Sequence, residues 1–203
     1  MESKKKLVLI TLASYFSVLT SLIIVVFFHL FREDHNPIMQ TMSEYTIGDF
    51  GFLFPIALLI LGLSSILALY SLHLKLPKTK LSKKILRYFS LWTVFIILTG
   101  IFPTDYITGP YTFSGITHAL SSYFAFLFFL IDVYYISLFC KKDINLNFDY
   151  IRFLTYFILS IPGLVIFLIV PLQYKGLTQR IFLTIIIIAY IDVISIPIRN
   201  IPK

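Results

Sequence analysis

The fold is decided by residues 50–73, FGFLFPIALLILGLSSILALYSLH, a stretch that contains no Asp, Glu, Lys or Arg. At about 1.5 Å per residue, a helix of this length crosses a hydrocarbon core of roughly 30 Å. Five further apolar stretches are also long enough to span: 7–31, 86–103, 117–140, 151–172 and 180–198. The sequence therefore predicts an all-α, polytopic membrane bundle with six transmembrane helices.

Lys and Arg are distributed unevenly around these stretches. Fourteen of the seventeen fall on the side that both termini share, whereas Arg32, Lys175 and Arg180 fall on the other side. Lys and Arg close to a span resist translocation, so both termini are predicted to be cytoplasmic. The segments around Ser43, Asp105 and Lys175 are then expected at the outer face.

Composition narrows the class of protein further. Of 203 residues, 58% are hydrophobic and only 13% are charged, so we expect one integral membrane domain, 1–203, and no soluble domain. The predicted location is the cell membrane, with several passes. Topology and anionic lipid headgroups explain the net charge of +7, so no nucleic-acid partner is expected. The apolar run after the basic start outlasts a signal-peptide core and is expected to remain as the first helix.

The unexplained polar residues concentrate at the predicted outer face, where three separate segments contribute them. In a compact bundle, these helix ends converge on one cavity. The residues concerned are Ser43 and Glu44 before the second stretch, Asp105 after the third, His118 in the fourth, and Gln179 with Arg180 at the sixth.

The motifs around these positions resemble the DUF998 family of bacterial and archaeal membrane proteins. The shared pattern is a Ser-Glu pair, Phe-Pro-x-Asp, a His and Gly-x-x-Gln-Arg, found here at 43–44, 102–105, 118 and 176–180. The likeness spans nearly the whole chain in the right order, although the loop 106–117 carries Tyr111 and Phe113 where a shorter linker would suffice. No activity is established for the family, so the resemblance implies a fold and a site position only.

The residues themselves suggest a chemistry. His118 shares a helical face with Ser122 and Asp132, and such a stripe is expected to face the bundle interior. Asp105 lies thirteen residues earlier, and a hydrogen bond between the two would make His118 a general base. Ser43 or a water would act as the nucleophile, with Glu44 beside it, and Arg180, Gln179, Ser122 and Tyr111 would bind the substrate. This constellation suits a hydrolase or transferase that acts on a lipid or lipid-linked substrate.

Three other interpretations remain open. In the first interpretation these polar residues are structural: Thr41 and Glu44 form a capping box, and Asp105 neutralises the charge of Arg180. In another, the chain binds a membrane lipid or a partner without catalysis. In a transporter, Asp132 and Asp192 would mark a polar route, although Asp192 more simply pairs with Arg152. Whether the protein is an enzyme is left open at this point.

No cofactor and no metal site are expected. Cys140 is the only cysteine, and the chain lacks the pair of histidines on one helix turn that zinc enzymes commonly supply. Trp92 and most tyrosines are expected to anchor the helices at the membrane interface.

Overall fold

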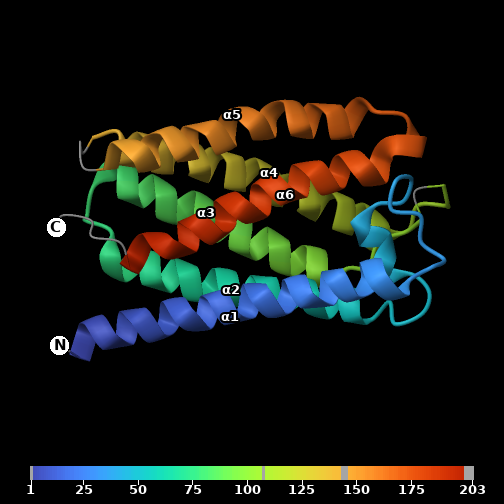
Figure 1. Ribbon diagram of the computed structural model, residues 1–203, viewed down its shortest axis with the longest axis horizontal. Helices are drawn as coiled ribbons and strands as arrows, with labels where there is room; N and C mark the ends of the chain where they lie inside the picture. Colours follow the sequence, from blue (N-terminus) through green and yellow to red (C-terminus); the bar gives the residue numbers. More distant parts are fainter. Residues whose placement is uncertain (1, 107, 143–145, 199–203) are drawn as a thin grey trace.

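A computed structural model describes residues 2–106, 108–142 and 146–198 as a bundle of long helices (Figure 1). The long helices are α1 (Glu2–Phe31), α2 (Leu53–Lys75), α3 (Lys80–Ile101), α4 (Phe113–Cys140), α5 (Asn147–Ile169) and α6 (Lys175–Ser195). The short 3-10 helices are η1 (Met42–Thr46), η3 (Leu172–Tyr174) and η4 (Ile196–Ile198). Each of the six long helices includes a segment apolar enough to cross a membrane, and the described residues contain no strand. The predicted fold class is thus confirmed.

Several helices begin before the apolar stretch that predicts them. α3 begins at Lys80, where the Thr79 hydroxyl caps it by accepting from the Ser82 amide at 3.1 Å, and α6 begins at Lys175. Hydropathy marks only the part of a helix that lies in hydrocarbon, whereas the backbone stays helical until a cap or a proline ends it. α3 accordingly ends at Ile101, two residues before Pro103.

Consecutive helices pack side by side in an up-and-down bundle, with the start of α1 and the end of α6 at the same end of it (Figure 1). We call that end the predicted inner end, and the end with the loops 32–52, 102–112 and 170–174 the predicted outer end. α2 and α3 approach closely because Gly62 lies against Ile97 and Gly100 lies against Leu59. α1 packs mainly on α2 and touches α6 at few points.

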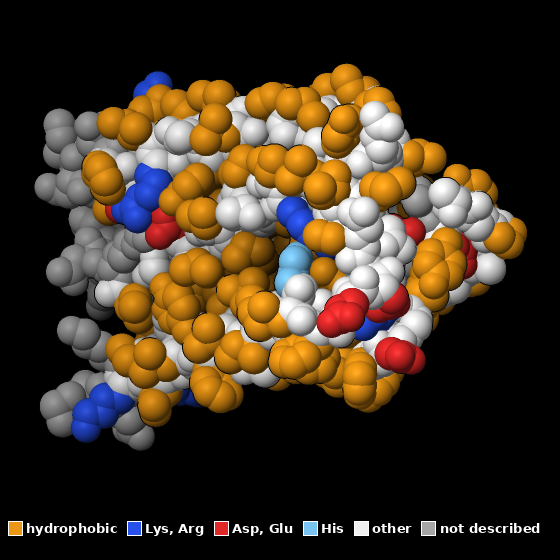
Figure 2. Space-filling view, turned by 45° about the vertical axis from the view of Figure 1, so that its right-hand side comes forward, with side chains coloured by type: hydrophobic (Ala, Val, Ile, Leu, Met, Phe, Trp, Pro, Cys, Tyr) orange, Lys and Arg blue, Asp and Glu red, His pale blue; other side chains and the backbone are white. Residues whose placement is uncertain are grey.

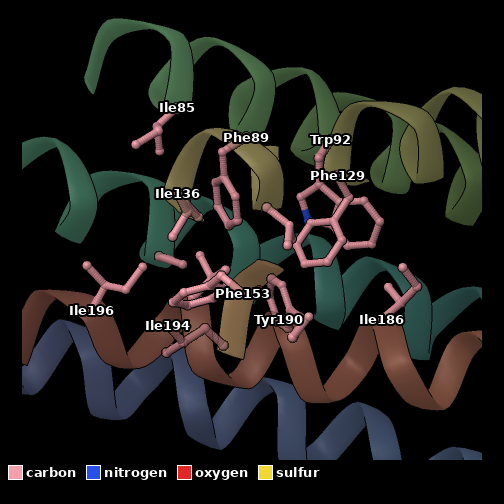
Figure 3. Packing of buried hydrophobic residues seen from close by; sticks show 14 of the residues in the cluster. Ile85, Phe89, Trp92, Phe129, Ile136, Phe153, Ile186, Tyr190, Ile194 and Ile196 are labelled. Atoms are coloured by element: carbon pink, nitrogen blue, oxygen red, sulfur yellow. The ribbon is translucent and has the colours of Figure 1, made fainter. Parts of the chain in front are cut away.

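Aromatic side chains fill the core between α3, α4 and α6 (Figure 3). The Trp92 ring lies 4.8 Å from that of Phe129, and both contact Tyr190. Trp92 is only 1% exposed, so the prediction that it anchors the membrane interface is wrong. An indole that donates its N–H to a buried partner is stable in a core, and Trp92 has such a partner in Ser65.

A cluster of hydroxyl groups joins α1, α2 and α6 inside this core. Ser14 and Ser64 each donate to the other's carbonyl oxygen at 2.8 Å. The Tyr190 hydroxyl donates to Ser64 Oγ at 2.8 Å, and Trp92 Nε1 donates to Ser65 Oγ at 3.1 Å. Hydrocarbon offers these groups no alternative partner, so the cluster holds four helices in one arrangement.

Removing the Tyr190 hydroxyl tests this cluster. Tyr190→Phe leaves the ring in place but removes a donor from Ser64, which is expected to cost on the order of 1 kcal/mol of stability. The thermal unfolding midpoint of the purified protein in lipid nanodiscs should fall. Tyr70→Phe, at a ring that is 42% exposed, is the matched control and should leave the midpoint unchanged. Equal midpoints for the two variants would contradict the role assigned to the cluster.

The orientation of the bundle remains a prediction and can be tested with single cysteines. In a Cys140→Ser background, Thr108→Cys is expected to react with a membrane-impermeant maleimide in intact cells. Lys78→Cys should react only after permeabilisation, because the lysine-rich connection between α2 and α3 stays cytoplasmic. Both positions are exposed, so access does not distinguish them. The reverse labelling pattern would invert the topology.

Candidate functional site

A cavity of about 420 Å³ lies at the predicted outer end of the bundle. It reaches inward to Leu61, Trp92 and Phe126, so its depth is apolar. Polar side chains lie among apolar ones over the rest of the wall and include Thr41, Ser43, Asp105, His118, Ser122, Lys175 and Gln179. Figure 2 shows a hollow with hydrophobic walls in the surface of the bundle. The size and the mixture of surfaces are those of a ligand pocket, typically about 300–1,000 Å³.

Most of the candidate residues taken from the sequence line this one cavity. They come from separate segments and are Ser43, Asp105, Tyr111, His118, Ser122 and Gln179. Glu44 and Arg180 do not line it. Both instead hold the loop 32–52, which carries part of the cavity wall.

Glu44 closes a capping box at the start of η1. Its Oε2 accepts from the Thr41 amide at 2.6 Å and from the Thr41 hydroxyl at 3.0 Å. The carboxylate is buried at 3% exposure, so these bonds hold it away from the cavity. The contacts match the structural interpretation of Glu44 and leave its candidate catalytic role without support.

Arg180 fastens the loop to α6. Its Nη1 donates to the carbonyl oxygens of Pro37 and Gln40, both at 2.8 Å, and its Nε donates to His29 Nε2 at 2.9 Å. Its Nη2 donates to the Tyr45 hydroxyl at 3.2 Å, and the guanidinium lies over the Tyr45 ring. These bonds engage all three guanidinium nitrogens, and the ion pair with Asp105 that the structural interpretation offered is not among those that the described residues form. The neighbouring Gln179 continues the attachment, because its Oε1 accepts from the Met42 amide at 2.6 Å.

Asp105 organises the start of α4. Its carboxylate accepts from the Thr112 amide at 2.6 Å and from the Thr112 hydroxyl at 2.9 Å. Thr112 in turn caps α4 by accepting from the Gly115 amide. Gly115 lies directly beneath the carboxylate, and a Cβ there would overlap it. Glycine at this position therefore lets Asp105 sit at the cavity wall.

His118 is held by backbone rather than by Asp105. Its Nδ1 lies 2.7 Å from the carbonyl oxygen of Phe102, where a neutral ring donates. In an Asp–His dyad this nitrogen would donate to the carboxylate. The predicted Asp105–His118 hydrogen bond is therefore wrong, because Thr112 and Phe102 satisfy the two groups separately. Ser122 also turns to backbone, since its hydroxyl donates to the His118 carbonyl at 2.8 Å.

Lys175 also lines the cavity, although in the sequence its charge served only to predict the orientation of the helices. Its ammonium donates to the carbonyl oxygens of Phe167 and Leu168, at 2.6 and 2.9 Å, and so caps the end of α5. Lys175 and Asp105 are the only Lys, Arg, Asp or Glu among the described residues that line the cavity. The feature of the sequence that could have indicated Lys175 as a cavity residue is its position in the connection between the fifth and sixth apolar stretches.

Two histidines, His29 and His35, lie near Arg180, and His29 accepts a hydrogen bond from it. Arg180 donates to His29 Nε2, and His29 Nδ1 lies 2.8 Å from the Val25 carbonyl oxygen, so the ring proton sits on Nδ1. His35 is buried and stacked 4.0 Å from the Tyr45 ring. Burial lowers the pKa of His35, and the nearby Arg180 and Arg32 charges lower it further. Arg32 in turn lowers the pKa of Asp34, to which it donates two hydrogen bonds.

These contacts predict that acid loosens the loop. Because the pKa of His35 is lower in the folded state, the unfolded chain binds the extra proton first. Stability is then complete above about pH 6.5 and falls as the pH drops towards the folded pKa. The thermal midpoint measured from pH 8 to pH 5 should fall less in His35→Gln than in the parent. His73→Gln, at an exposed position of the predicted inner end, should keep the parental pH dependence.

Comparison with known proteins supplies a family. A scan against protein families matches residues 16–194 to "Protein of unknown function (DUF998)". The chain belongs to the DUF998 family. The match covers all the candidate residues, and the resemblance seen in the sequence is thereby confirmed. Searches of curated proteins and of solved structures each returned no match. Because the function of this family is unknown, membership does not indicate an activity or a substrate for the cavity.

The described residues contain no cluster of three His, Cys, Asp or Glu side chains able to hold a metal ion. Apart from tyrosines, the ionisable side chains that line the cavity among the described residues are Asp105, His118 and Lys175. Each is held by backbone or by a neighbouring threonine. The arrangement is preorganised for contacts with a polar group rather than for transfer of a proton along a relay.

Proposed function

We propose that this protein binds a membrane lipid, with the polar head in the cavity and the acyl chains against its apolar depth. The observation that carries the proposal is the division of the cavity wall. Hydroxyl, amide and charged groups lie at the predicted outer end, and Leu61, Trp92 and Phe126 lie deeper. An amphiphile aligned with the bilayer presents the same order of surfaces.

A side opening between α1 and α6 supports access from the bilayer. Leu22 of α1 lines both the cavity and a second apolar hollow along the α1–α6 groove, which also includes Tyr15 and Ile191. Two hydrogen bonds cross this groove, His29–Arg180 towards the predicted outer end and Tyr15–Ile191 towards the predicted inner end. Between these two contacts, an acyl chain has an apolar path from the lipid into the cavity.

The charges on the wall favour a headgroup without large net charge. Asp105 supplies one negative charge and Lys175 one positive charge. The Lys175 ammonium has a third N–H beyond the two that cap α5, and the Asp105 carboxylate has lone pairs beyond those used by Thr112. A zwitterionic phospholipid offers phosphate oxygens to the first and an ammonium group to the second.

Hydrolysis of the lipid is the weaker interpretation. A base and a nucleophile need hydrogen-bond contact, and neither Ser43 nor Asp105 makes one with His118. The Ser43 hydroxyl lines the cavity, so it remains a contact for a headgroup. The proposal therefore assigns Ser43, Asp105, His118, Ser122, Lys175 and Gln179 to binding.

Filling the cavity should displace the lipid. Ala119→Phe adds a ring at a position on α4 that lines the cavity, whereas Leu127→Phe adds bulk on the same helix at a side chain that is 45% exposed. Phospholipid retained after delipidation in detergent is measured by native mass spectrometry. Retention is expected to fall at least about tenfold in Ala119→Phe, in the range of about 1.4 kcal/mol or more, and to be unchanged in Leu127→Phe.

Both variants should first show the parental thermal midpoint in nanodiscs. A folded Ala119→Phe protein that retains the same phospholipid to the same extent would contradict binding in the cavity. Recovery of cleaved lipid from the parent but not from His118→Gln would instead establish the hydrolase.

A further inference from the structure

Asp132 lies in the inner half of α4 and is completely buried, with 0% exposure. Neither oxygen of its carboxyl group contacts a hydrogen-bond donor among the described residues. It also forms no ion pair with any of them. It does not line the cavity, so the proposed lipid site makes no use of it.

Aromatic packing separates Asp132 from that cavity. Phe129 lies one helical turn nearer the predicted outer end, is fully buried, and packs against Trp92 and Tyr190 (Figure 3). Trp92 is part of the cavity floor. Val133 and Ile136 on the other side of Asp132 are buried as well. The carboxyl group therefore lies in an apolar layer below the cavity.

Several titratable groups on the neighbouring helices are bound to other partners. The pairs are Arg152 with Asp149 and with Asp192, Tyr156 with Asp192, Tyr190 with Ser64 and Ser65, and Lys84 with Tyr135. The expected pairing of Asp192 with Arg152 is thus present, at 3.1 Å. None of these groups compensates a charge on Asp132.

We propose that Asp132 is a proton-binding site inside the bundle and carries its proton at neutral pH. An ionised carboxylate without a partner is costly at the centre of a membrane helix, and far more so in a dry interior. A bound proton removes that charge, which is the largest part of the cost of burying the group. A metal cation fits less well, because Ca²⁺ or Mg²⁺ requires about six or more oxygen ligands and Asp132 supplies two.

Infrared spectroscopy tests the proposal directly. The parent protein in nanodiscs at pH 7 is expected to show the carbonyl stretch of a protonated carboxylic acid, shifted by carboxyl-labelled [¹³C]aspartate. Asp132→Asn should remove this band. Asp192→Asn, which changes an ion-paired carboxylate, should leave the band in place. A band that survives Asp132→Asn, or its absence from the parent, would overturn the proposal.

A second measurement needs no variant. A hydrophobic carbodiimide reacts with the acid form of a carboxyl group: the carboxyl oxygen bonds to the central carbon, and the acid proton moves to a carbodiimide nitrogen. Peptide mass spectrometry of the labelled parent should find at least about ten times more adduct on Asp132 than on Asp192. Equal or greater labelling of Asp192 would count against a proton on Asp132. Neither measurement reports on lipid bound in the cavity, so either can fail while the lipid-binding proposal stands.

Discussion

Hydrocarbon gives no hydrogen bonds, and the arrangement of this bundle follows from that constraint. Every hydroxyl, indole or charged group between the helices must find its partner within the protein. Ser14 and Ser64 do so across α1 and α2, and Tyr190 and Trp92 bring α6 and α3 to the same cluster. The aromatic core packs around these contacts rather than defining the arrangement alone. Asp132 departs from this rule, because both of its carboxyl oxygens are buried without a hydrogen-bond partner among the described residues, as are the hydroxyls of Thr11 and Ser71.

The helices were predictable from the sequence because hydropathy reports the quantity that a membrane selects for. The polar contacts between helices were not. Serine contributes little to hydropathy, and the pairing of Ser14 with Ser64 joins positions fifty residues apart with no local signal. Trp92 was misplaced for a related reason, since an indole suits an interface or a core equally well until its N–H partner is known. That partner, Ser65, lies on another helix.

The sequence indicated which residues gather at the predicted outer end, but the contacts inferred for several of them were wrong. The sequence suggests that Arg180 binds an anion, because guanidinium groups bind anions well. In the structure, its N–H groups instead donate to backbone carbonyl oxygens of the loop 32–52. The short loop between Asp105 and His118 suggests that the two side chains form a hydrogen-bonded dyad. Thr112 intervenes, since a threonine that caps α4 is also the nearest donor to the carboxylate. Local capping thus outcompetes the longer-range pair, and only the Glu44 capping box was visible as a pattern in advance.

The groove between α1 and α6 makes the shape of the protein sensitive to its surroundings. α1 packs chiefly on α2 and touches α6 at few points, so a change in its tilt alters mainly the gap to α6, between the His29–Arg180 and Tyr15–Ile191 contacts. Helices adjust their tilt to the thickness of the bilayer at a modest cost in free energy. A thicker or thinner membrane would thereby widen or narrow the gap between the first and last helices. We expect the bilayer in which this protein resides to set how readily its interior exchanges molecules with the surrounding leaflet.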